Sequence, residues 1–203
     1  MNPGEVRPAV APQGETVSTR LAPRILAIVI GAAVVALAAQ VSFRLPLTVV
    51  PWTLQPLAVL IVGGLLGAGG GASALVLYLA AGASGLPVFA GGSGGALHLI
   101  GPTGGYLLAY PLAAAVTGWP CGRADRRAGG QAGRRAVFTT LLACLVGMLI
   151  IHIGGVSQLA ILGGDPAAAF RMGFLPFFAN DLVKVGLAAL LILALRPRLR
   201  AIR

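Results

Sequence analysis

The chain has 203 residues, of which 57% are hydrophobic and 10% are charged, whereas a soluble domain carries about 25% charged residues. Its mean hydropathy is +0.91, and its apolar residues occur in long runs, so we predict an integral membrane protein. The net charge of +10 would suggest a nucleic-acid partner in a soluble protein, but no basic patch is interleaved with aromatic residues, and we expect no nucleic-acid binding.

Residues 1–24 are polar and rich in proline and glycine, and they contain no apolar segment followed by a small-residue cleavage site. They do not resemble a signal peptide, and we expect a disordered cytoplasmic tail. The first predicted span, residues 25–43, is uncharged. Its Ala32 and Ala36 lie four positions apart, a spacing that lets another helix approach closely. The alternative is that they reflect only the alanine content common in such spans.

Prolines at positions 46, 51 and 56 prevent a continuous helix between the first and second spans. This loop contains Thr48 and also Trp52, a residue typical of membrane interfaces. Its Arg44 either snorkels at the end of the first span or reaches into a site. Gln55 lies where the second span begins. The second and third predicted spans, residues 54–66 and 72–86, are separated by a glycine-rich turn, and the third carries Tyr78.

A second glycine-rich segment, residues 85–107, follows the third span. Such a density of glycine permits close backbone approach to a ligand or to a neighbouring helix. The segment is not a phosphate loop, because the chain has no G-x-x-x-x-G-K-[ST] pattern. We expect a structured substrate lid, with a flexible loop as the alternative. His98 has no potential ligands at metal spacing, so we predict neither a metal site nor a cofactor on this chain.

The last three spans are predicted at residues 105–119, 136–156 and 176–195. The sixth carries the chain's single lysine, Lys184, three residues after Asp181. The neutral amide of Asn180 directly precedes Asp181. An ionised side chain near the bilayer centre costs about 2.5–3.5 kcal/mol. Because residues three apart share a helix face, the pair can point into a protein interior. A ligand or ion site is favoured over an ion pair that only orients the helix.

The basic residues predict a topology. We expect an all-α bundle of six transmembrane helices over residues 25–195, with both termini cytoplasmic and residues 196–203 forming a basic C-terminal tail. This arrangement places twelve of the fifteen basic residues inside, as the positive-inside rule requires, where some can contact anionic lipid. The proline-containing loop after the first span, the second glycine-rich segment and the start of the sixth span then meet at the outer side, which predicts a pocket that opens outwards. The twelve inner residues are Arg7, Arg20, Arg24, Arg123, Arg126, Arg127, Arg134, Arg135, Arg196, Arg198, Arg200 and Arg203.

Four segments carry a family resemblance: PWTLQP at residues 51–56, GLPVFAGG at 85–92, GPTGGYL at 101–107 and FFANDLVK at 177–184. In this order they resemble BioY, the biotin-specific substrate-binding (S) component of energy-coupling-factor (ECF) transporters. The resemblance implies a protein of a bacterial-type cytoplasmic membrane that captures biotin from outside. It also implies that a transmembrane coupling protein and two ATP-binding-cassette ATPases supply the energy for uptake.

The resemblance also implies roles for particular residues. The family's Asp-x-x-Lys pair, which contacts biotin, maps onto Asp181 and Lys184, and the first helix would dock on the coupling protein through Ala32 and Ala36. The loop after the first span would close the pocket, with Arg44, Thr48 and Trp52 as its lid residues. The remaining substrate-binding candidates are Gln55, Tyr78, Gly92, Ser93, Gly94, Tyr106 and Asn180.

The chemistry of biotin suits these residues. Its ureido ring has two N–H donors and a carbonyl acceptor, and its side chain ends in a carboxylate. Asp181 can accept from the N–H groups, and Lys184 can donate to the carbonyl or to the carboxylate. An intramembrane enzyme is disfavoured, because neither an H-E-x-x-H pattern nor a pair of intramembrane aspartates is present. The alternative function is an ion-coupled secondary carrier for a small carboxylate solute, which would require an internal repeat that the sequence does not show.

Overall fold

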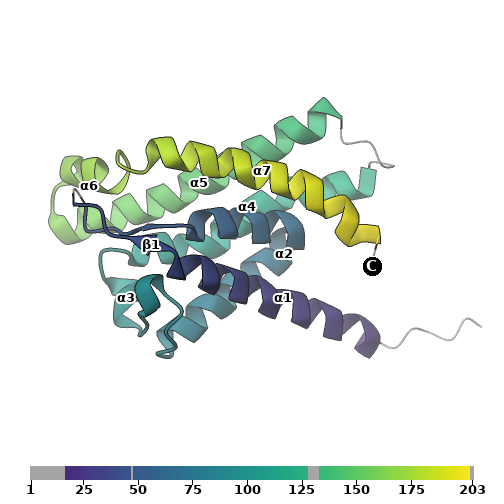
Figure 1. Cartoon of the computed structure of the whole chain (residues 1–203), viewed down its shortest axis with the longest axis horizontal. Coiled ribbons are helices and arrows are strands. Elements are labelled where there is room, and N and C mark those ends of the chain that lie inside the picture. Colours follow the sequence, from purple (N-terminus) through teal and green to yellow (C-terminus); the bar gives the residue numbers. More distant parts are fainter. Residues whose placement is uncertain (1–16, 47, 128–132, 202–203) are drawn as a thin grey trace, which may run out of the picture.

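The computed structural model describes residues 17–46, 48–127 and 133–201. Within these ranges the chain is almost entirely helical, with five long helices and two short ones (Figure 1). The long helices are α1 (Val17–Gln40), α2 (Gln55–Ala83), α4 (Gly104–Arg127), α5 (Arg134–Gly163) and α7 (Phe178–Ala201). The shorter elements are β1 (Ser42–Phe43), β2 (Trp52–Thr53), the 3₁₀ turn η1 (Ala90–Gly92), α3 (Leu97–Ile100) and α6 (Pro166–Gly173).

Helix α2 contains both the second and the third predicted spans. Its ladder is interrupted at Gly67, whose φ of 78° and ψ of 174° are not helical. A Cβ built on Gly71 would lie 2.7 Å from the Cα of Gly63, although eight residues of continuous helix rise about 12 Å. The chain therefore reverses at Gly67, and α2 is a helical hairpin with a first arm at residues 55–66 and a second arm at residues 68–83.

The helix count consequently differs from the expected six. The hairpin is one element, and α3 and α6 are short helices that the sequence pattern did not predict as spans. Four helices of the described ranges are long and apolar enough to cross a membrane, namely α1, α2, α5 and α7. Large apolar side chains such as Leu37, Ile161 and Leu190 are exposed on their outer surfaces, as expected of helices that face lipid.

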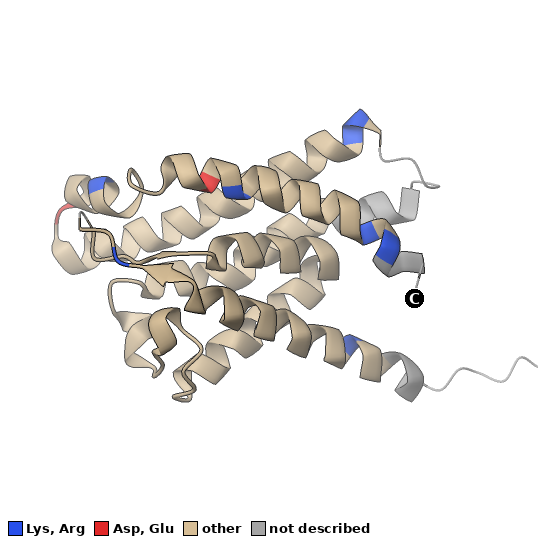
Figure 2. Ribbon diagram, in the orientation of Figure 1, with Lys and Arg blue, Asp and Glu red and all other residues tan. Residues whose placement is uncertain are grey.

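The long helices run alongside one another between two chemically different ends. At one end lie the start of α1, the end of α7 and the facing ends of α4 and α5 (Figure 1). The other end, here called the cavity end, carries the β1–β2 hairpin, α3 and α6. Charged residues gather at the two ends, apart from a neighbouring acidic and basic pair on α7 (Figure 2). The first end is called the arginine-rich end after Arg24, Arg134, Arg135, Arg196 and Arg198.

Helix α1 begins at Val17, within the range expected to be the N-terminal tail, and α7 continues to Ala201. Residues 1–16, 128–132 and 202–203 lie outside the described residues, so the expected tails are placed only in part.

Gly31, Ala32 and Ala36 of α1 pack against the core, whereas Ala33 is exposed. Ala32 is 8% exposed within the core, and Ala36 is half-buried against the same core. A Cβ on the neighbouring Gly31 would lie 3.1 Å from side-chain atoms of Val62 and Ala74. The close approach that small residues permit is therefore used at least in part inside the chain, and docking of a partner through Ala32 and Ala36 stays a prediction.

The loop after α1 contains a short antiparallel pairing that the sequence did not predict. Ser42 pairs with Thr53, and Phe43 pairs with Trp52, whose rings lie 5.7 Å apart. The prolines at positions 46 and 51 lie between the two strands, where they remove backbone donors without breaking the pairing. The hairpin therefore closes over the cavity end as a defined structure.

The glycine-rich segment after α2 also has a defined backbone. Gly91 and Gly92 have φ values of 67° and 72°, which L-residues with a side chain rarely adopt. The turn that they make lets Phe89 pair with Ser93 and bury its ring. That ring packs edge-on against Tyr78 at 5.6 Å and against Gly82, where a Cβ would not fit. The segment is thus anchored to the second arm of α2.

Candidate functional site

A cavity of about 620 Å³ lies at the cavity end of the bundle, within the range of about 300–1,000 Å³ typical of small-molecule sites. It is enclosed by the β1–β2 hairpin, the start of α2, the glycine-rich segment, α4, α5 and α7. Its polar and aromatic lining includes Arg44, Thr48, Thr53, Gln55, Phe89, Ser93, His98, Thr103, Tyr106, Tyr110, His152, Phe177, Asp181 and Lys184.

Asp181 is the central polar group of the cavity wall. It lies in the first turn of α7, where the positive end of the helix dipole favours a negative charge. Its Oδ1 accepts from Lys184 Nζ at 2.8 Å, and its Oδ2 lies 2.7 Å from Nε2 of His152 on α5. The three residues are 4–6% exposed, so this mutual pairing offsets much of the cost of burying them.

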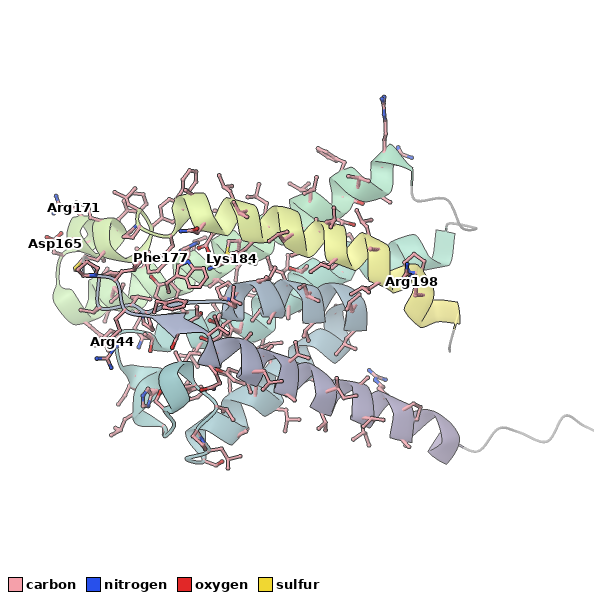
Figure 3. The ribbon with its side chains drawn as sticks, viewed as in Figure 1. Arg44, Asp165, Arg171, Phe177, Lys184 and Arg198 are labelled. Atoms are coloured by element: carbon pink, nitrogen blue, oxygen red, sulfur yellow. The ribbon has the colours of Figure 1, made fainter. Side chains whose placement is uncertain are left out.

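Lys184 has a second contact from the hairpin. Its Nζ lies 4.7 Å from the centre of the Trp52 ring, a cation–π arrangement. Phe177 and Lys184 lie inside the bundle, whereas Arg44 lies at its edge (Figure 3), and its residue surface is exposed. Trp52 therefore acts on the cavity through Lys184, while Arg44 and Thr48 contribute to the lining itself.

Gln55 and Tyr78 form a hydrogen-bonded link between the two arms of α2. Gln55 lines the cavity, and its Nε2 donates to the Tyr78 hydroxyl, which in turn donates to the Val88 carbonyl at 3.2 Å. The backbone N–H of Gln55 donates to the Thr53 hydroxyl at 3.3 Å. Tyr78 lies behind Gln55 rather than on the cavity wall, so it positions the amide instead of facing a ligand.

Helix α4 supplies an aromatic wall. Tyr106 and Tyr110 are four residues apart, and they therefore share the face that lines the cavity. The Tyr106 hydroxyl donates to the Gly173 carbonyl at 2.7 Å, which ties α4 to the end of α6. This hydrogen bond fixes the wall against the turn that leads into α7.

The structure separates the predicted glycine-loop residues. Ser93 lines the cavity, and its hydroxyl donates to the Ala90 carbonyl at 2.9 Å. Gly92 and Gly94 are not on the cavity wall, which Ala90 and Gly91 form instead. A Cβ on Gly94 would lie 3.0 Å from the Gly85 carbonyl, so this glycine permits close backbone packing rather than contact with a ligand.

Asn180 also lies off the cavity, and it is exposed. Successive residues of a helix point about 100° apart, so the rotation that turns Asp181 inwards turns its neighbour outwards. The predicted residues that the structure brings to the cavity wall are Arg44, Thr48, Gln55, Ser93, Tyr106, Asp181 and Lys184.

Sequence reasoning did not select His152, His98 or Phe177 for the site, although all three line the cavity. His152 is an ionisable residue inside an apolar span, so the rule that selected Asp181 and Lys184 applies to it equally. Its partner Asp181 is 29 residues away, and no spacing rule connects two helices at that separation.

The cavity suits an anionic organic ligand better than a metal ion. Among the described residues, no group of three or more His, Cys, Asp or Glu side chains could hold a metal ion, and the ammonium of Lys184 already occupies one side of Asp181. Its charged lining groups are Arg44, Lys184 and Asp181. With neutral histidines these groups leave one positive charge, which a monoanion would balance.

Comparison with known proteins gives one consistent result. A model of the BioY family matches residues 13–201. A probable biotin transporter BioY of Pyrococcus horikoshii is 39% identical over 142 residues, which cover 70% of this chain and 78% of that relative. A biotin transporter BioY of Thermotoga maritima is 39% identical over 153 residues, covering 75% and 84%.

A solved structure has the same fold. It is the S-component for biotin from an ECF-type ABC transporter, which matches with a TM-score of 0.78 at 23% identity. The match covers 91% of this chain and 95% of that one. The helical hairpin and the short helices around the cavity therefore belong to a fold already observed in a solved protein.

Proposed function

The chain belongs to the BioY family, and on this basis we propose that it captures biotin and takes part in biotin uptake as the substrate-specific subunit of an ECF-type transporter. The observation that carries the proposal is the buried Asp181 carboxylate in the wall of a cavity of about 620 Å³. A cyclic urea carries N–H donors from which such an acceptor can take a hydrogen bond, and hydrogen bonds to an ionised acceptor are the stronger kind.

The rest of the ligand fits the remaining groups of the cavity. The valerate carboxylate is a monoanion and balances the positive charge left by Arg44, Lys184 and Asp181. The apolar bicyclic ring packs against the aromatic wall of Tyr106, Tyr110 and Phe177. No observation favours the alternative of an ion-coupled carrier for a small carboxylate solute, and the relatives are named as transporters rather than enzymes.

Titration of the purified chain with radiolabelled biotin tests this function. We expect saturable binding that unlabelled biotin abolishes and that biotin methyl ester, which lacks the anionic carboxylate, competes for less well. Absence of saturable binding by a folded sample would overturn the proposal. Uptake by cells that express the chain with and without an ECF coupling protein and its two ATPases then measures how far transport depends on these partners.

The orientation is part of the proposal. The two arms of α2 count as separate crossings beside α1, α4, α5 and α7, and the arginine-rich end faces the cytoplasm of a bacterial-type membrane. The charge distribution of Figure 2 supports this orientation through the positive-inside rule. The cavity end then opens to the outside, where biotin arrives, and the coupling protein and ATPases act from the other side.

A matched pair of cysteine variants tests the orientation. Gly133 and Gly163 lie at opposite ends of α5, and neither has an atom within 4 Å of a built Cβ. In a background without Cys121 and Cys144, we expect Gly163→Cys to react with an impermeant thiol reagent added outside intact cells. Gly133→Cys should react only after the cells are opened, and the reverse pattern would invert the topology.

A further inference from the structure

The Asp181 carboxylate is held from two helices at once. Lys184 is on the same helix and donates to Oδ1, while His152 reaches across from α5 to Oδ2 at 2.7 Å. A lysine side chain has many rotamers and by itself fixes one oxygen loosely. The imidazole is short and stiff, so the second contact fixes the plane of the carboxylate.

Packing fixes the position of the His152 ring. The ring stands edge-on to Phe174 at 5.0 Å and edge-on to Tyr106 at 6.3 Å. Tyr106 in turn lies over Gly155 of α5, where a Cβ would overlap the tyrosine ring. The groups that face His152 are thus two aromatic rings, from α4 and from the turn before α7, and the carboxylate of Asp181.

The hydrogen-bond partners of His152 define its tautomer. Nδ1 is buried and has no hydrogen-bond partner among the residues that the structure describes. A proton on Nδ1 would leave a buried donor unpaired, and an imidazolium would add a second positive group beside Lys184. The neutral ring with its proton on Nε2 donates to Asp181 and leaves no buried donor unpaired.

We propose that His152 is a positioning residue that donates from Nε2 to Asp181 and orients its carboxylate for the ligand. The inference rests on the proposed function, because the ligand that uses the carboxylate is biotin. A carboxylate has about four lone-pair sites, and Lys184 and His152 each use one, on different oxygens. One site on each oxygen remains, and from these the carboxylate can accept an N–H group of the cyclic urea. Sites preorganised in this way bind more tightly than sites whose groups must first be ordered.

Two substitutions separate donation from packing. Gln places an N–H close to the position of Nε2 but has no ring, whereas Phe keeps a ring against Phe174 and Tyr106 but cannot donate. We expect His152→Gln to keep the biotin Kd within about threefold of the wild type, and His152→Phe to raise it by about ten- to a hundredfold. A role in packing alone would give the opposite order. Equal affinities in both variants, or equal losses, would also contradict donation.

A nitrogen NMR measurement tests the same contact without biotin. The chain has two histidines, so ¹⁵N-histidine labelling of the intact protein gives two ring systems, and His98→Gln assigns them. We expect His152 to show the neutral tautomer protonated at Nε2, and the tautomer protonated at Nδ1 would overturn the proposal even if a variant failed to fold. If the wild type bound no biotin, the proposed function would fail, while the nitrogen signals would still decide whether His152 donates to Asp181.

Discussion

The cavity end and the middle of the bundle are built from the same helices but from different side chains. Towards the cavity end, α4, α5 and α7 present Tyr106, His152 and Asp181. About two turns further along, the same helices present small or aliphatic residues: Ala113 and Ala114 on α4, Gly147 on α5, and Ala188 and Ile192 on α7. We call this second region the packed half.

The difference shows how one bundle separates stability from recognition. In the packed half, a Cβ on Gly63 would lie 2.7 Å from the Cα of Ala114, and one on Gly64 would lie 2.7 Å from Cγ1 of Ile192. Helices that approach this closely are held by van der Waals contact. At the cavity end, Lys184 and His152 pair with Asp181 in the wall of the cavity. Substitutions in the packed half should therefore affect the stability of the fold, and substitutions at the cavity end should affect ligand binding.

The largest effect is expected when the ion pair of the cavity is removed as a unit. Replacing both partners in the double variant Asp181→Asn/Lys184→Met should weaken biotin binding by at least about a hundredfold, because a buried charged acceptor is lost. Replacement of a buried ion pair by groups of similar volume is often neutral or stabilising, and the new amide still accepts from His152. Biotin titration and thermal unfolding of the purified protein measure the two quantities.

Asp165→Asn is the matched control for this variant. Asp165 is exposed and caps α6 by accepting from the backbone N–H groups of Ala167 and Ala168, so biotin affinity should not change. Unaltered binding by the double variant would remove Asp181 and Lys184 from the site. A large fall in its unfolding temperature would show instead that the pair is needed for folding. The cavity end would then contribute to stability as well as to ligand binding.

The reverse pattern is expected in the packed half. Gly63→Ala places a methyl group against the backbone of Ala114, which cannot move without shifting α4. We expect this overpacking to cost about 1–3 kcal/mol, and thermal unfolding should report it. The fraction of protein that remains folded should bind biotin with wild-type affinity, because Gly63 is not part of the cavity lining.

Gly186→Ala is the control at a helical glycine without such a neighbour. Gly186 is exposed on α7, and a Cβ there meets no atom within 4 Å. This variant should gain about 0.5–1 kcal/mol, since Ala is the better helix former. If the two glycine variants had equal stability, the close packing at Gly63 would not make the packed half more sensitive to an added methyl group than the exposed surface is.

The two regions also differ in how well the sequence predicted them. The rule that ionisable groups are expensive in a membrane selected Asp181 and Lys184 directly, and the structure places both on the cavity wall. The same rule did not yield the contact between His152 and Asp181, because that contact joins α5 to α7 and depends on the rotation of both helices. Asn180 fails for a related reason, since adjacent residues cannot share a helix face.

Small residues were harder to interpret than charged ones. The spacing of Ala32 and Ala36 indicated a close helix contact, but a spacing does not identify the partner helix; in the structure both residues pack against the core, and the neighbouring Gly31 packs against α2. The reversal at Gly67 was expected from the glycine-rich turn, although the two arms form one element. Gly92 and Gly94 were taken as ligand contacts, whereas in the structure Gly92 permits a backbone turn and Gly94 permits close backbone packing.

The smallest effect is expected at the mouth of the cavity. Arg44 is exposed there, so solvent and salt screen its attraction for an anionic ligand. Arg44→Gln should weaken biotin binding by about two- to fivefold at low ionic strength, the range of an exposed ion pair. Most of the loss should appear in the association rate, because a rim charge acts by steering the ligand.

Salt and the methyl ester of biotin separate steering from contact. At about 1 M salt the Debye length falls to about 3 Å, and the difference between Arg44→Gln and the wild type should disappear. The neutral ester should not distinguish the two proteins at any salt concentration. Arg171→Gln is the matched control, since Arg171 lies at the same end of the molecule (Figure 3) but not on the cavity wall. A loss of affinity at Arg44 that persisted in high salt would place its guanidinium in direct contact with the carboxylate of biotin. The ligand-binding groups of the cavity end would then extend to the mouth of the cavity.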